Sequence, residues 1–275
     1  MSRRAWLAFA AMSVIWGIPY LLIRIAVRDG VTPAMLAWTR VILAGVVLLA
    51  LAWRAGVLRP LRGRWWWLLA YAVAEVAIPF PMIAAGEQHV SSSLAAILIA
   101  SVPLIGALLA IRFDHSEKPT AVRGLGLLVG FAGVIALVGI DVAGRSGELL
   151  GAVEIMIAAV GYAIGPMVIK LRLGELDPRA SMGASLAVAS VLLAPGAALD
   201  LPHRVPSAGA IVCVVVVFLV LMHSGKDAGL SGAFGVGTGT GPMGGGSLVE
   251  RNLNRWTIVF AVLFTINTIV LIKIS

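Results

Sequence analysis

Residues 34–53 read AMLAWTRVILAGVVLLALAW, twenty residues that carry a single charge, at Arg40. A helix needs about 20 consecutive apolar residues to cross the hydrocarbon core of a bilayer. Similar apolar stretches recur along the 275-residue chain, which is 60% hydrophobic and 12% charged. Soluble domains carry about a quarter charged residues. The sequence therefore predicts an all-α polytopic membrane protein and argues against a soluble enzyme.

The apolar stretches predict about nine transmembrane helices. They cover Ala5–Val27, Ala34–Trp53, Trp65–Ala85, Leu94–Ile111, Gly124–Ile140, Leu149–Ile169, Ala180–Leu199, Ser207–Met222 and Trp256–Ile272. With the N-terminus in the cytoplasm, 15 of the 21 Lys and Arg residues lie on the cytoplasmic side, four lie on the other side and two lie inside spans. This bias follows the positive-inside rule. We therefore expect a bacterial inner-membrane protein with a cytoplasmic N-terminus and an external C-terminus, and the net charge of +8 needs no nucleic-acid partner.

The first seven predicted helices contain a weak internal repeat. Thr32-Pro33 opens the second span, and Asp177-Pro178 opens the seventh. Five spans separate the two copies, and an odd number inverts the second copy relative to the first. Inverted repeats are a common architecture of secondary transporters.

Residues 5–210 resemble the EamA family of drug/metabolite transporters. The matching features are Trp16-Gly17, Pro33 with Arg40 behind it, and Pro103. A glycine series in the fifth span also fits: Gly124, Gly126, Gly130, Gly133 and Gly139. The resemblance implies ten helices in two five-helix repeats, whereas this chain shows one repeat and two helices of the next. We therefore expect a truncated EamA-like module over residues 1–210.

Four residues of this module are candidates for substrate binding or coupling: Trp16, Arg40, Glu75 and Pro103. Ionisable groups inside a membrane are costly and mark functional sites. Glu75 is either a proton-coupling or cation-binding carboxylate, or a packed structural residue that is protonated or paired with Arg. Arg40 could pair with Glu75 or hold an anionic substrate.

Residues 211–275 resemble SecG, a two-helix subunit of the Sec preprotein translocase. A glycine-dense link separates two apolar helices. The residues that fit the SecG motifs are His223, Gly225, Lys226, Gly229, Leu230 and Phe234, followed by Glu250, Asn252, Leu253, Arg255 and Thr257. Seven preceding spans leave the chain outside, so the eighth span returns it and places the link in the cytoplasm, as the SecG topology implies. We expect His223, Gly225, Lys226, Gly229, Glu250, Asn252 and Arg255 to form a translocase contact loop.

The SecG resemblance predicts an accessory subunit of the Sec translocase that carries an incomplete EamA-like region. SecY, SecE and SecA would be its partners, together with the lipid bilayer. Two alternatives stay open: efflux of a small metabolite or drug by the EamA-like part, and a gene-fusion artefact. A homodimer through the EamA-like part would supply the missing wall of a transport site.

No enzymatic chemistry is expected from the sequence. The four histidines lie on separate links rather than at metal-ligand spacing: His89, His115, His203 and His223. The single cysteine, Cys213, lies inside a span and excludes an intrachain disulfide. We therefore expect no catalytic residue, no metal and no cofactor.

Overall fold

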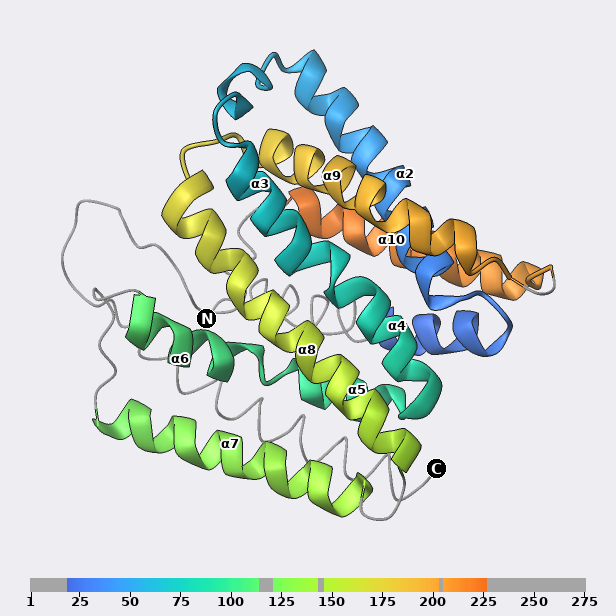
Figure 1. Cartoon of the computed structure of the whole chain (residues 1–275), viewed down its shortest axis with the longest axis vertical. Coiled ribbons are helices and arrows are strands. Elements are labelled where there is room, and N and C mark those ends of the chain that lie inside the picture. The colour runs from blue at the N-terminus through green and yellow to red at the C-terminus, as the bar shows by residue number, and fades with distance from the viewer. Residues whose placement is uncertain (1–18, 114–120, 143–145, 203–204, 227–275) are drawn as a thin grey trace, which may run out of the picture.

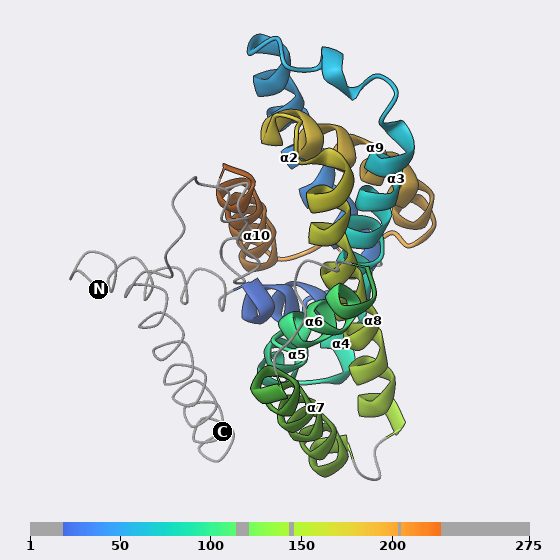
Figure 2. The same cartoon turned by 90° about the vertical axis from the view of Figure 1, so that its left-hand side faces the viewer.

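The computed structural model describes residues 19–113, 121–142, 146–202 and 205–226. These residues form an all-helical bundle, and no strand occurs among them. Figures 1 and 2 show α8 (Ser146–Val168) crossing the middle of the bundle, with α7 (Ala121–Val142) at one edge. On the other side lie α2 (Pro33–Arg54) and α9 (Pro178–Leu199).

Five helical segments are long and apolar enough to cross a membrane: Pro33–Arg54, Trp65–His89, Ser92–Phe113, Gly147–Leu173 and Pro178–Leu199. They coincide with five predicted spans. Helices α7 and α10 (Ala208–Lys226) lie at two more, with shorter apolar parts at Gly124–Ala136 and Ala208–Val217. The first predicted span is helical over residues 19–28, and Trp256–Ile272 lies outside the described residues. The prediction of a multi-pass membrane protein is therefore confirmed.

Proline and a side-chain cap start both α2 and α9. The Thr32 hydroxyl accepts a hydrogen bond from the Met35 amide at 3.4 Å, and the Asp177 carboxylate accepts one from the Arg179 amide at 2.8 Å. Pro33 and Pro178 occupy the first helical turn, where a missing N–H costs nothing. The two matching halves of the predicted repeat therefore begin their helices in the same way.

Helices α2 and α9 form the most extensive helix pair in the described chain and run antiparallel. The Thr32 hydroxyl, at the start of α2, donates to the Asp200 carbonyl oxygen at the end of α9 at 2.5 Å. Further along, the Trp38 indole donates to the Ser190 carbonyl oxygen at 3.0 Å. A β-carbon on Gly183 would lie 3.0 Å from a backbone nitrogen of α2, so this glycine permits close approach of the backbones.

Two other spans are interrupted rather than straight. Helix α3 (Trp65–Ala72) passes through a π-helical segment, Val73–Ala77, into α4 (Pro79–His89). Pro79 has no N–H to donate, which accounts for the local change of hydrogen bonding. Helix α5 (Ser92–Ile99) is followed by α6 (Val102–Phe113), and the Ser101 hydroxyl donates to the Leu98 carbonyl oxygen at 2.6 Å at the break.

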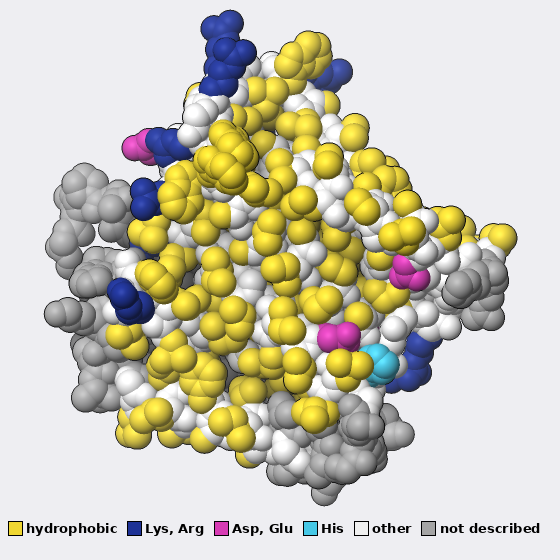
Figure 3. Space-filling model, in the orientation of Figure 1, with side chains coloured by type: hydrophobic (Ala, Val, Ile, Leu, Met, Phe, Trp, Pro, Cys, Tyr) yellow, Lys and Arg dark blue, Asp and Glu magenta, His cyan; other side chains and the backbone are white. Residues whose placement is uncertain are grey.

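The surface fits lipid as its solvent. Figure 3 shows one face that is largely hydrophobic, with Lys and Arg side chains at its upper and left edges. Large apolar side chains are exposed on several helices, including Val46, Leu128 and Val191. In water such a continuous surface would be an aggregation liability, whereas hydrocarbon tails cover it without cost.

Candidate functional site

Glu75 lies in the π-helical segment between α3 and α4 and faces the bundle interior. Its side chain is buried, with 8% of the residue exposed. Its Oε2 atom has no hydrogen-bond partner within the described part of the chain. Gly165 of α8 lies opposite, and a β-carbon there would overlap the Glu75 carboxylate. The glycine therefore makes the space that the carboxylate occupies.

Arg40 is buried on α2, with 5% of the residue exposed. Its guanidinium carbon lies 3.8 Å from the centroid of the Phe80 ring, a cation–π contact. No ion pair joins Arg40 to Glu75 among the described residues, and the Arg40 Nε atom finds no hydrogen-bond partner there. Of the two roles predicted for Arg40, pairing with Glu75 is therefore not what the structure shows.

Three tyrosines lie near the two ionisable groups. Tyr162 of α8 lies within electrostatic range of both Arg40 and Glu75. Tyr20 lies within the same range of Arg40, and Tyr71 within that of Glu75. The site is thus a buried polar cluster in which an acid, a base and phenolic groups share a low-dielectric interior.

Glu87 belongs to this interior as well, and the sequence analysis missed it. The residue is completely buried in α4, and its Oε2 atom accepts a hydrogen bond from the Ser92 hydroxyl at 2.9 Å. The Oε1 atom has no partner among the described residues. The sequence predicts that this span ends at Ala85, whereas the helix continues to His89. Extending the predicted span by about one helical turn beyond Ala85 would have included Glu87.

The other two predicted transport residues do not join the cluster. Trp16 lies outside the described residues. Pro103 is on the first turn of α6, and its side chain is exposed. Its position just after the α5–α6 break fits a role in starting α6.

The predicted translocase loop is described only in part. His223, Gly225 and Lys226 lie on the last turn of α10, so their backbone is helical where we expected the start of a loop. The remaining loop residues lie outside the described part: Gly229, Glu250, Asn252 and Arg255.

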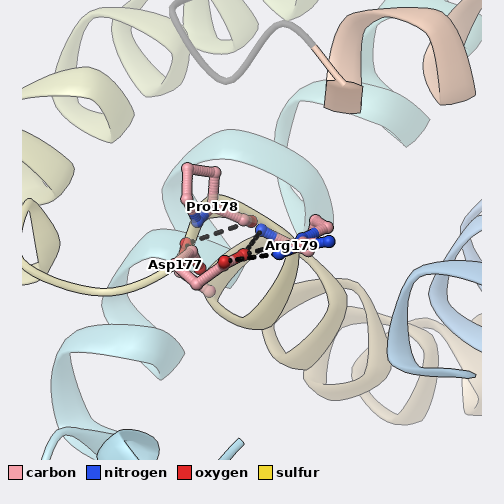
Figure 4. A network of polar contacts seen from close by, with 4 residues as sticks. Asp177, Pro178 and Arg179 are labelled. Atoms are coloured by element: carbon pink, nitrogen blue, oxygen red, sulfur yellow. Dashed lines mark hydrogen bonds and ion pairs between the residues drawn. The ribbon is translucent and has the colours of Figure 1, made fainter. Parts of the chain in front are cut away.

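A small polar network lies at the start of α9, between Asp177 and Arg179 (Figure 4). The Arg179 guanidinium lies 2.9 Å from the Asp177 carboxylate, and this hydrogen bond, with the amide contact, lowers the pKa of Asp177. Two residues before Asp177, Glu175 forms an ion pair with Arg64 of a distant segment at 2.9 Å. The Arg64 guanidinium also donates to the Arg172 carbonyl oxygen. These exposed pairs contribute little to stability individually.

Among the described residues, no group of three or more His, Cys, Asp or Glu side chains could hold a metal ion. The acids of the buried cluster are carried singly: Glu75 on the π-helical segment and Glu87 on α4. The chemistry available there is ion pairing, hydrogen bonding and proton binding.

Two family models match this chain over separate regions. Residues 3–139 match the EamA-like transporter family, and residues 207–275 match the preprotein translocase SecG subunit. The EamA match lies inside the predicted module over residues 1–210, and the SecG match begins four residues before the predicted start at residue 211.

Individual relatives divide the chain in the same way. The uncharacterized inner membrane transporter YedA of Escherichia coli K12 is 35% identical over 164 residues, covering 58% of this chain and 50% of YedA. The protein-export membrane protein SecG of Corynebacterium glutamicum is 38% identical over 56 residues, covering 20% of this chain and 71% of that protein. SecG of Streptomyces coelicolor is 50% identical over 46 residues, covering 17% of this chain and 44% of that protein. The chain thus spans about half the length of the transporter relatives it matches.

A chain in a solved crystal structure has a similar fold. It aligns with a TM-score of 0.52 and 20% identity, covering 79% of this chain and 80% of its own length. At this identity the likeness concerns the fold alone.

Proposed function

Because the C-terminal region of this chain belongs to the SecG family and follows an EamA-like transporter region, we propose that it is an accessory subunit of the Sec translocase. The observation that carries the proposal is how much of each family the chain contains. The SecG match runs over residues 207–275 and includes most of a complete SecG relative. The EamA match covers residues 3–139. We accordingly propose a boundary at residue 210.

The proposed topology supports this role. Seven crossings from a cytoplasmic N-terminus bring the chain to the outer face, and α10 then crosses back. The glycine-dense link would lie in the cytoplasm, where Lys226, Glu250 and Arg255 could contact the channel subunit or the motor. In this arrangement the protein is a multi-pass subunit of the bacterial inner membrane with an external C-terminus.

Copurification tests the proposal. The full chain, tagged and extracted from bacterial membranes in mild detergent, should capture a SecY-type channel with its SecE partner. Joint replacement of Glu250 and Arg255 with Ala should reduce capture, whereas the buried Glu75→Gln variant should retain it. Failure of the unaltered chain to retain any channel subunit would refute the proposal.

A second candidate function is transport of a small polar solute by the EamA-like region. The favouring observation is that Arg40 and Glu75 each bury a polar atom without a partner in the described chain. An unsatisfied buried polar atom costs about 1–3 kcal/mol, so a bound solute or proton would recover that loss. The site would lie between α2, the π-helical segment and α8.

This candidate ranks second because the region carries only seven helices that resemble the EamA fold. Alternating access needs two repeats that move about a shared site. We expect the chain in proteoliposomes to show no coupled flux on its own. Flux that disappears in Glu75→Gln would overturn this ranking and would favour the transporter role.

A further inference from the structure

We infer that α10, the first SecG-like helix, is a structural wall of the EamA-like bundle, so that the two regions fold as one body. Among the α10 residues whose side chains the structure describes, Ala210, Cys213 and Val217 are buried, at 1%, 7% and 3% exposed. Their spacing of three and four places them on one helix face. The intervening Val212 is 60% exposed.

The buried face of α10 joins the main core of the transporter-like region. One continuous hydrophobic cluster contains Ala210, Cys213 and Val217 together with Ile23 of the first helix and Leu36 of α2. Contacts with α2 and α9 accompany this packing. A helix tied to the bundle only by a flexible link would not share a core with it.

The start of α10 contacts a residue near the beginning of the EamA-like region, which is far away in sequence but adjacent in space. The Ser207 hydroxyl accepts a hydrogen bond from the Ala210 amide at 3.2 Å, which caps the helix. The Ser207 amide donates to the Asp29 carboxylate at 2.9 Å. Asp29 lies at the end of the helix over residues 19–28, so the first helix of the bundle positions the first residue before α10.

A shared wall changes how the hairpin can act. Moving α10 away would uncover both its own buried face and the core residues beneath it. The SecG-like hairpin would therefore carry the bundle with it into any complex, and a membrane partner could reach only the face that includes Val212. This inference concerns the isolated chain and does not depend on whether a translocase binds.

Mercuration of the native thiol tests it in the full chain. Phenylmercuric acetate partitions into lipid and bonds a protonated thiol, with the proton leaving as acetic acid. Cys213 should react with it about tenfold more slowly than a cysteine at position 212, since residue 213 is 7% exposed and residue 212 is 60% exposed. The comparison chain carries Val212→Cys with Cys213→Ala. Adjacent positions differ by only about 1.5 Å in depth, so access through lipid is matched. Equal rates would overturn the inference.

A second measurement tests the join. Asp29→Ala removes the acceptor for the Ser207 amide and should raise the mercuration rate of Cys213 severalfold. Asp29→Asn keeps an acceptor oxygen and should stay close to the parent chain. Unchanged protection of Cys213 in Asp29→Ala would show that the contact between Asp29 and Ser207 does not position α10. The comparison at positions 212 and 213 decides the inference even if this variant fails to fold, and channel copurification reports separately on the proposed function.

Discussion

Gly161 sits where α8 crosses the interrupted helix α3–α4, and replacing it with Ala should destabilise the bundle. A β-carbon at this position would overlap the carbonyl oxygen of Ala74 and would lie 2.9 Å from the Pro79 ring. Neither obstacle can rotate away, because one is backbone and the other is a closed ring. The two helices must separate instead, and overpacking of this kind typically costs about 1–3 kcal/mol.

The matched control is Gly133→Ala on α7, where a new β-carbon would meet nothing within 4 Å. Without a clash, the better helix propensity of Ala should leave stability unchanged or raise it by up to about 1 kcal/mol. Equilibrium unfolding of both variants in mixed micelles, with SDS as denaturant, gives the two free energies. If Gly161→Ala proves as stable as Gly133→Ala, the close crossing at Ala74 is not present and the reasoning fails.

Three further variants probe the buried acids and the α9 cap. Gly165→Ala meets the flexible side chain of Glu75 rather than backbone, so the same unfolding assay should give a smaller loss than at position 161; a larger loss would mean that the carboxylate is rigidly held. Glu87→Gln keeps an acceptor for the Ser92 hydroxyl and cannot ionise, so stability should not fall, whereas Glu87→Ala should cost about 0.5–1.5 kcal/mol by removing that hydrogen bond, since the hydroxyl keeps the Tyr20 carbonyl oxygen as an acceptor at 3.3 Å. The hydrogen bonds to Arg179 lower the pKa of Asp177 in the folded protein. Its contribution to the free energy of unfolding is therefore complete above the ordinary Asp pKa of about 3.9 and is lost as the pH falls through the lower pKa of the folded state. Unfolding measured from pH 7 to 2 should therefore show a loss of stability at the acid end that Asp177→Asn lacks, and identical profiles would contradict the capping role.

The fold was largely predictable because hydrophobic length reports directly on membrane spans. Pro33 and Pro178 also marked two helix starts correctly, since the first turn is where a proline costs least, although Pro166 and Pro195 lie inside α8 and α9. The breaks within the helices were harder to predict from the sequence. Pro79 and Pro103 signal a break, but whether the chain answers with a π-helical segment or with a gap between helices depends on tertiary contacts.

The candidate site was predictable only in part. Arg40 and Glu75 stood out as charges inside apolar spans, and both are buried. Whether Arg40 and Glu75 pair could not be predicted from the sequence. Arg40 instead contacts the ring of Phe80, which lies on a different helix. Glu87 was not predicted as a site residue because the predicted span ends at Ala85, four residues before the helix does. The residue therefore counts as part of a polar link in the sequence, whereas it is buried in the structure.

The opposed directions of α2 and α9 have an electrical consequence. Each peptide carries a dipole along its helix axis, and in an antiparallel pair of equal length the two sums cancel. A membrane voltage acts on net displaced charge, at about 2.3 kcal/mol per elementary charge per 100 mV. Tilting the two helices together in the membrane therefore reorients almost no net backbone dipole. Any voltage sensitivity of such a motion would have to come from an ionised side chain that travels with it, and Arg40 is the one that α2 buries.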